Sequence, residues 1–426
     1  MIMEMFEKHE SNVRSYCRSF PVVFRTAKNA VIQDEAGRSY IDFFAGAGAL
    51  NYGHNNDFIK NRLLAHLQED YVTHGLDMYT TVKREFIKTF ADLVLNPRNL
   101  DYKLQFCSPT GTNAVEAALK LARRVKGRTN IFAFMGGFHG MSLGSLAATA
   151  NLYCRQAAGI PLQGVTLMPY PAGGIDGIDT IAYMEHVLSD ENSGIEKPAA
   201  ILFESVQAEG GVYPAPAEWM MRLRKLCDDH DILLICDDIQ VGCGRIGPFF
   251  SFERAGITPD IVLLSKSIGG YGLPLALVLL KPELDIWKPG EHNGTFRGNQ
   301  LAFTAATAAL QFREQTGLEQ EVIRKGEIVR DYLTSMAEEL DGEVEIRGLG
   351  LFWGIDVKHA GGAEAAKRIA DQCFSNGLIM ERSGRNDTVL KVMPPLTIES
   401  ELLMEGLQLI SKTMAEEIGS KFISVG

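Results

Sequence analysis

The sequence predicts an α/β fold, with a large domain built on a mostly parallel sheet and a smaller α+β domain after it. Short apolar runs alternate with helical segments over residues 55–312, which is typical of a parallel sheet covered by helices. Over residues 313–426 long helices accompany strands with an alternating, half-exposed pattern. The length of 426 residues also exceeds what one hydrophobic core usually covers.

Residues 1–54 are expected to form an N-terminal segment that packs with the small domain. Residues 30–33 and 39–42 flank the turn-forming stretch 34–37, so a β-hairpin is predicted there. The stretch 43–54 is rich in glycine and small residues. Such a stretch allows close approach of a ligand, and it is equally compatible with a tight packing corner.

The first candidate ligand site follows a strand at 104–107. A helical pattern over residues 59–95 precedes this strand, and a helix over 114–125 follows it. The turn Thr110-Gly111-Thr112 between them would offer free amides and a helix dipole to a phosphate. A plain helix cap explains the same residues, so both interpretations remain open.

An aromatic residue follows the next predicted strand, 130–134. Phe138 and His139 lie between glycines there, and an aromatic ring in this position is well placed to stack on a planar ligand. A histidine in such a place is more often structural than catalytic. Another buried strand, 199–204, leads to the stretch 207–211.

The chain is organised around two further strand ends. The apolar run 232–236 ends in Asp237, and the run 261–264 is followed closely by Lys266. Open α/β sheets bind ligands at the edge where their parallel strands end. An aspartate and a lysine at this edge suit pyridoxal phosphate (PLP), because lysine can form a Schiff base and aspartate can pair with the pyridinium nitrogen. A buried ion pair is the alternative explanation.

The small domain is predicted from its periodicity. Its expected elements are a helix over 319–340, two half-exposed strands over 344–347 and 351–356, a helix over 363–375, a strand over 388–392 and a helix over 399–418.

Composition excludes several classes of function. The net charge of −11 disfavours nucleic acid as a partner. No apolar run approaches the roughly 20 residues needed to span a bilayer, and the first residues lack a signal-peptide core. The seven cysteines show no metal-like spacing. We therefore expect a cytoplasmic protein that acts on small molecules and uses no metal.

Six motifs together resemble the class III (omega-type) PLP-dependent aminotransferases. They occupy residues 110–112, 137–140, 204–211, 237–245, 265–266 and 294–296, in the family's order. The resemblance covers nearly the whole chain. It implies a fold-type I architecture and an active site at the interface of a homodimer or higher homo-oligomer.

The resemblance also implies roles for individual residues. Lys266 would hold PLP and shuttle the substrate proton, and Asp237 would keep the pyridine nitrogen protonated. The remaining implied cofactor contacts are Thr110, Gly111 and Thr112 at the phosphate, Phe138, His139 and Ile239 at the ring, Gln240 at the 3′-oxygen and Thr295 from the partner subunit.

Within this family the chain resembles the branch that makes L-2,4-diaminobutyrate for ectoine biosynthesis. The likeness lies in residues 15–21, 43–54, 73–78 and 109–116. The implied reaction moves the amino group of L-glutamate to L-aspartate 4-semialdehyde. Ornithine, acetylornithine, 4-aminobutyrate and siderophore-linked aminotransferases remain alternatives, as do an aminomutase or racemase on the same fold and a PLP-binding regulatory protein.

One departure from the family concerns the group that binds a substrate carboxylate. Many relatives place an arginine near the position of Lys391, and lysine cannot form arginine's planar, bidentate fork. Glu209 corresponds to the family's gating glutamate, so we predict a Glu209–Lys391 switch, assisted by Arg297. The alternative for Lys391 is a solvated strand residue. Asn51 is expected on the amino-acceptor side of the substrate.

Overall fold

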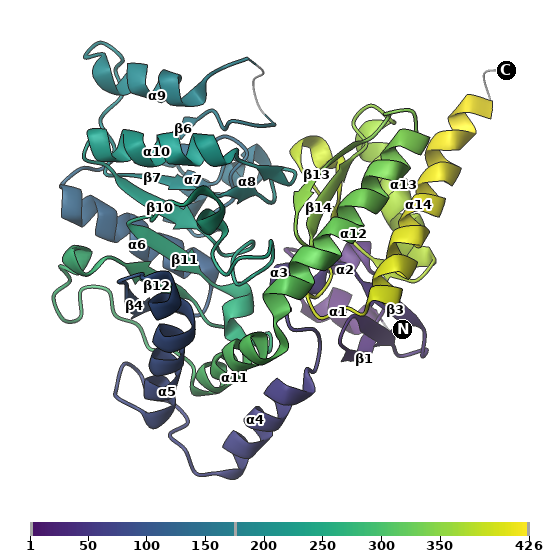
Figure 1. Cartoon of the computed structure of the whole chain (residues 1–426), viewed down its shortest axis with the longest axis horizontal. Coiled ribbons are helices and arrows are strands. Elements are labelled where there is room, and N and C mark those ends of the chain that lie inside the picture. The colour runs from purple at the N-terminus through teal and green to yellow at the C-terminus, as the bar shows by residue number, and fades with distance from the viewer. Residues whose placement is uncertain (1–2, 174–176, 424–426) are drawn as a thin grey trace.

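The computed structural model describes residues 3–173 and 177–423, and its largest element is a seven-stranded sheet (Figure 1). The strand order is β4-β12-β11-β10-β7-β5-β6. Only β12 runs antiparallel to its neighbours, so the predicted mostly parallel sheet is confirmed. The strands are β4 (Lys103–Phe106), β5 (Ile131–Phe134), β6 (Thr166–Met168), β7 (Ala200–Phe203), β10 (Leu233–Asp237), β11 (Ile261–Leu264) and β12 (Leu277–Leu280).

Helices cover both faces of this sheet, because alternate strand residues point to opposite sides. Leu234 and Val262 belong to an apolar cluster with α5 and α10. Ile235 and Leu263 belong to a second cluster, which is shared with α6. The helices of this part are α4 (Asp57–Gln68), α5 (Thr81–Phe90), α6 (Gly111–Lys126), α7 (Leu143–Ala148), α8 (Leu152–Gln156), α9 (Thr180–Ser189), α10 (Ala217–Asp229) and α11 (Gln300–Thr316).

The continuous helical pattern predicted over residues 59–95 is wrong in its middle. Helix α4 ends at Gln68, and α5 begins only after Thr80, whose hydroxyl caps it by accepting from the backbone N–H of Lys83 (3.1 Å). The same hydroxyl donates to Gln300 on α11 (2.8 Å). A tertiary contact and a helix cap therefore make 69–80 a connecting loop.

The C-terminal part is built on a four-stranded antiparallel sheet with the order β13-β14-β17-β16, seen on the right of Figure 1. The prediction that residues 351–356 are half-exposed is wrong, because β14 is buried throughout. Trp353 packs with the helices of this part. Phe352 packs with Val206 and Val212 of the large part. The elements are α12 (Leu318–Glu339), β13 (Glu345–Leu349), β14 (Phe352–Asp356), α13 (Gly362–Ser375), β16 (Glu381–Ser383), β17 (Val389–Val392) and α14 (Ser400–Ile423).

The N-terminal segment shares a sheet with the C-terminal part. The predicted hairpin is present as β2 (Val31–Asp34) and β3 (Ser39–Asp42), and β1 (Phe24–Lys28) extends it. The short strand β15 (Leu378–Ile379) pairs in parallel with β3. Three short helices, α1 (Glu4–His9), α2 (Tyr16–Ser19) and α3 (Ala45–Gly48), belong to the same segment.

Helix α11 continues past the predicted domain limit at residue 312. It ends at Thr316 and is followed by the capping residue Gly317, whose φ of +58° is a left-handed conformation that favours glycine. The domain limits at 54/55 and 312/313 themselves stay predictions. None of the helices within 3–173 and 177–423 is long and apolar enough to cross a membrane.

Candidate functional site

A cavity of about 180 Å³ lies at the edge of the large sheet where β10 ends. Most of the residues that the sequence singled out for a cofactor line it. These are Gly111, Thr112, Phe138, His139, Asp237, Ile239, Gln240 and Lys266. Two others, Thr110 and Thr295, do not line this cavity.

Strand pairing brings Asp237 and Lys266 to this cavity. Strands β10 and β11 are parallel, with Asp237 opposite Leu263, so the residues that follow β11 lie at the same edge. Lys266 has a φ of +50°, a strained conformation for a residue with a side chain and one that is common at functional sites. Burial lowers the pKa of its amine, and the Glu209 carboxylate opposes this shift without cancelling it. A lowered pKa makes a lysine a better nucleophile.

The carboxylate of Asp237 is held on both of its oxygens. Oδ2 lies 2.7 Å from Nδ1 of the buried His139, and Oδ1 accepts the backbone N–H of Ile239 (3.2 Å). Burial would lower the pKa of His139, but the hydrogen bond and charge of Asp237 raise it overall. The result is a buried, oriented carboxylate of the kind that can pair with a pyridinium nitrogen.

Glu204 also lines the cavity, although no individual role was predicted for it. Its Oε2 accepts the backbone N–H of Phe138 (3.2 Å), so it positions the aromatic residue. Burial raises the pKa of Glu204 to about 7, against the opposing charge of His139. Its place at the end of the predicted strand 199–204 was the available signal, since carboxylates after buried strands face the same edge as Asp237.

The turn before α6 combines the two interpretations that the sequence left open. Thr110 is the N-cap residue of α6, and both its backbone N–H (3.3 Å) and its hydroxyl (2.7 Å) donate to Oδ1 of Asn113. Gly111 and Thr112 line the cavity at the helix N-terminus, where an anion is favoured. A Cβ at Gly111 would lie 3.1 Å from Cδ1 of Ile239, so a larger residue would narrow the space there.

These groups fit PLP. The cavity offers a lysine amine, a buried carboxylate, a helix N-terminus for a phosphate, and the side chains of Phe138 and Ile239 for the two faces of a ring. The side-chain oxygen of Gln240 has no hydrogen-bond partner among the described residues, while its Nε2 donates to Ala47 O (3.0 Å). Among the residues that the structure describes, no cluster of side chains suitable for a metal ion occurs.

Lys391 on β17 is completely buried, and its Nζ lies 2.7 Å from Oε1 of Glu209. The contact that the predicted Glu209–Lys391 switch requires is therefore present, and the solvated alternative for Lys391 is wrong. The switch itself stays a prediction. Glu209 lies on the turn between β8 (Val206–Gln207) and β9 (Tyr213–Pro214). Burial would raise the pKa of Glu209, but the Lys391 ammonium holds it below its usual range.

Lys391 has a second partner that the sequence did not reveal. Oε2 of Glu381 lies 2.9 Å from the same ammonium. Glu381 begins β16, a three-residue strand that is too short to be recognised by its periodicity. Burial would lower the pKa of Lys391, but the two carboxylates hold it well above its usual range.

Five residues expected at the site do not line this cavity in the single chain, namely Thr110, Lys391, Thr295, Arg297 and Asn51. Thr295 is exposed, and Arg297 donates to the carbonyl oxygen of Phe106 (3.4 Å). Asn51 is fully buried, accepts from Arg245 Nη2 (2.6 Å) and donates to Cys243 O (3.2 Å). Both ends of its amide are therefore engaged within this chain, and a role of Asn51 in substrate binding stays a prediction.

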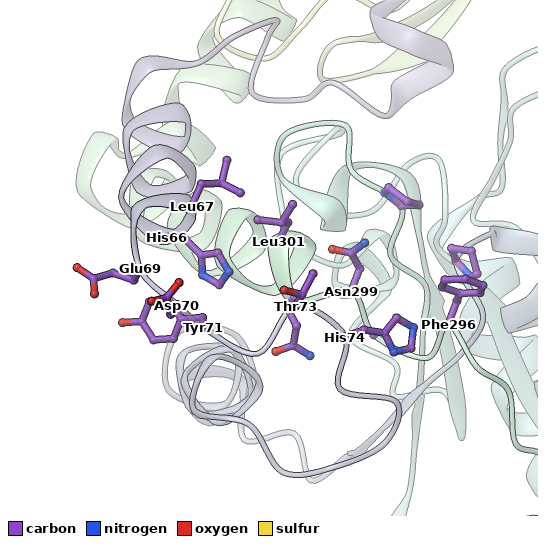
Figure 2. A pocket seen from close by; sticks show the side chains of 14 residues that line it. His66, Leu67, Glu69, Asp70, Tyr71, Thr73, His74, Phe296, Asn299 and Leu301 are labelled. Atoms are coloured by element: carbon purple, nitrogen blue, oxygen red, sulfur yellow. The ribbon is translucent and has the colours of Figure 1, made fainter.

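A larger cavity, of about 520 Å³, lies between the loop 69–80 and the segment 296–301 (Figure 2). The side chains of His66, Tyr71, His74 and Phe296 are among those that line it. No lysine is among the residues that line this larger cavity, whereas Lys266 lines the smaller one. A reaction that needs a lysine amine is therefore assigned to the smaller cavity.

Comparisons with known proteins agree with this chemistry. The family model described as "Aminotransferase class-III" matches residues 14–414. A protein of Bordetella parapertussis named diaminobutyrate--2-oxoglutarate transaminase is 54% identical over 423 residues, which are 99% of this chain and 97% of that protein. One of the same name from Halalkalibacterium halodurans is 52% identical over 98% of both chains.

Among solved structures, the ornithine aminotransferase of Toxoplasma gondii, described with partial occupancy of PLP at its active site, is similar to this chain. It has a TM-score of 0.85 and 26% identity over 99% of this chain and 95% of that one. The fold is therefore that of the PLP-dependent aminotransferases, as the sequence predicted. The chain belongs to the class III aminotransferases, and its cofactor is pyridoxal phosphate.

Proposed function

We propose that this enzyme transfers the amino group of L-glutamate to L-aspartate 4-semialdehyde and forms 2-oxoglutarate and L-2,4-diaminobutyrate. The names of relatives that are 54% and 52% identical over nearly the whole chain support these substrates. One structural observation carries the proposal, namely the ion pair between the buried Lys391 and Glu209, which lines the cavity that holds Lys266.

The ion pair suits an enzyme with two dissimilar substrates. L-Glutamate carries a carboxylate on the carbon that loses its amino group, and the ammonium of Lys391 can bind it when Glu209 moves aside. The reacting carbon of L-2,4-diaminobutyrate carries no carboxylate, and Glu209 then neutralises Lys391. A buried ammonium must have such a partner, since an unpaired buried charge is strongly unfavourable.

The other residues have roles that follow from their positions. PLP, when bound, supplies an electron sink at the substrate carbon. Lys266 holds the cofactor and moves the proton at that carbon, and Asp237, oriented by His139, holds the proton on the pyridine nitrogen. The amides at Gly111 and Thr112 bind the phosphate.

A homodimer would complete the site. Thr295 is exposed in the single chain, and the neighbouring Phe296 has 64% of its surface exposed. The loop 69–80 presents the fully exposed ring of Tyr79. Apolar surface of this kind favours a protein contact. Within this proposal Thr295 reaches the partner's phosphate, Arg297 lies near the partner's substrate, and the enzyme acts in the cytoplasm in ectoine biosynthesis.

A panel of amino donors and acceptors tests the proposed function. The purified holoenzyme would be mixed with single donors, and the change in the visible absorbance of its cofactor would be followed. L-Glutamate and L-2,4-diaminobutyrate should react faster than L-ornithine, N-acetylornithine and 4-aminobutyrate, and 2-oxoglutarate should form in equal amount to the diaminobutyrate made. A preference for ornithine, or return of the amino group to the same carbon skeleton, would contradict the proposal. The Lys266→Ala variant is the inactive control.

A further inference from the structure

The ammonium of Lys391 is held by two carboxylates in different ways. Glu381 is its direct cross-strand neighbour in the antiparallel pair β16–β17. The backbone ladder therefore keeps Glu381 beside Lys391. Glu209 lies on a turn, and 32% of its side-chain surface is exposed, compared with 11% for Glu381. Glu209 can leave the ammonium, whereas Glu381 is fixed.

The two carboxylates also face different spaces. Glu209 lines the cavity that contains Lys266. Glu381 lines a separate cavity of about 310 Å³, beside Tyr16 of the N-terminal segment. The Lys391 ammonium thus lies between the two spaces, and only Glu209 is in the path of a substrate.

The charges in this cluster do not cancel. Lys391 contributes one positive charge, and Glu209 and Glu381 contribute one negative charge each, so the closed cluster has a surplus negative charge. One carboxylate would be enough to neutralise the ammonium. The charges of Glu209, Lys391 and Glu381 also affect the pKa of the Lys266 amine. A substrate group bound beside Lys266 lies in the same field.

The surplus charge matters because of the substrates proposed above, on which this inference rests. L-2,4-Diaminobutyrate and L-aspartate 4-semialdehyde carry a free α-ammonium two carbons from the reacting carbon. 4-Aminobutyrate has the same carbon chain and the same carboxylate without that ammonium. A surplus negative charge beside the substrate cavity stabilises the α-ammonium of the first type of substrate and has no such group to stabilise in the second.

We propose that Glu381 is a specificity-determining residue, whose fixed negative charge makes the cavity select, in the half-reaction at a terminal amine or aldehyde, substrates that keep a free ammonium beside their carboxylate. In this arrangement Glu209 responds to the substrate carboxylate, and Glu381 supplies the charge that distinguishes amino-acid substrates from simple ω-amino acids.

The test compares L-2,4-diaminobutyrate with 4-aminobutyrate, because the two donors differ only in the α-ammonium. Single-turnover rates of the holoenzyme would be measured for both, in the wild type and in Glu381→Gln, which keeps the size of the side chain and removes its charge. Burial raises the pKa of Glu381 against the opposing charge of Lys391, so the measurement is made at pH 8. The preference for diaminobutyrate should fall about tenfold, which corresponds to about 1.4 kcal/mol, mainly through weaker binding.

Two further variants separate charge from shape. Glu381→Asp keeps the charge and should keep most of the preference. Asp387→Asn removes one negative charge from the same 310 Å³ cavity. Asp387 is not one of the two carboxylates that contact Lys391, so the preference should change less than twofold. An unchanged preference in Glu381→Gln, or an equal loss in Glu381→Gln and Glu381→Asp, would overturn the inference.

The result is distinguishable from a failure of the proposed function. If the wild type itself does not prefer diaminobutyrate over 4-aminobutyrate, the proposed substrates are wrong. If the wild type has the preference and Glu381→Gln retains it, only the role of Glu381 is wrong. Should Glu381→Gln fail to fold, as judged by thermal unfolding, Glu381→Met removes the same charge from a side chain of similar length and should lower the same preference.

Discussion

The imidazole of His139 lies 2.7 Å from Asp237, and both side chains are buried below the cavity that contains Lys266. This contact orients the carboxylate that we propose to pair with the pyridine nitrogen of the cofactor. The remaining anchor of Asp237 is the backbone N–H of Ile239.

Replacing His139 should weaken cofactor binding. His139→Phe removes a hydrogen bond to a buried charge, which is worth about 1.5–3 kcal/mol, so the dissociation constant of PLP should rise about tenfold or more. Fluorescence titration of the apoenzyme with PLP measures it. The surface variant His186→Asn is the control, because His186 is exposed and neither it nor its ion-pair partner Asp190 lines the cavity. Equal affinities for PLP in His139→Phe and wild type would contradict the role of the pair.

Replacing Lys391 should separate the two half-reactions. Lys391→Ala removes the group proposed to bind the α-carboxylate of glutamate, so the Michaelis constant for L-glutamate should rise at least tenfold, in line with the roughly 2–5 kcal/mol cost of losing one partner of a buried ion pair. The reaction with diaminobutyrate should retain more of its rate. Single-turnover kinetics with each donor measure both effects. Lys358→Ala, at a partly exposed lysine of the same part of the chain, is the control. An unchanged Michaelis constant for glutamate would rule out the switch.

The buried carboxyl of Asp238 should make stability depend on pH. Burial raises its pKa from 3.8 to about 7. Between these values the folded protein holds a proton that the unfolded chain releases, so raising the pH lowers the free energy of unfolding, by at most about 1.4 kcal/mol per pH unit. Asp238→Asn mimics the protonated form and should stabilise the holoenzyme at pH 8 relative to wild type, with little difference at pH 5.

Thermal unfolding of both proteins at pH 5 and pH 8 measures this difference. Asp101→Asn, at an exposed carboxylate, is the control and should show the same difference between the two pH values as the wild type. A stabilisation by Asp238→Asn that is the same at both pH values would mean that the carboxyl does not titrate in this range.

Asn51 should matter for stability and not for substrate affinity. Its side-chain oxygen accepts from the fully buried guanidinium of Arg245, whose pKa burial lowers to about 9. Asn51→Ala leaves this buried donor without its partner, and the cost should be about 1–3 kcal/mol. Urea unfolding measures the loss, with the exposed Asn192→Ala as control. A large rise in the Michaelis constant with unchanged stability would instead support the predicted role of Asn51 in substrate binding.

Much of the cofactor site was accessible from the sequence, because it depends on local patterns. A buried parallel strand is recognisable by its apolar residues, and the position of Asp237 at its end follows from the strand itself. The same holds for Lys266 after β11 and for Gly111 at the start of α6. Parallel strands bring such ends to one edge of a sheet, so the cavity could be predicted without knowing the strand order.

Tertiary structure alone decided how charges and loops combine. Nothing local distinguishes Glu381 from a surface glutamate, because its role arises from the register of a three-residue strand opposite Lys391. The loop 69–80 was hidden within a helical pattern, and its contact with Gln300 comes from a distant helix. The contacts of Asn51 could not be predicted, because its partner Arg245 is far away in the sequence. Sequence periodicity reports which residues are buried, whereas the free energy of a buried charge depends on its partners in space.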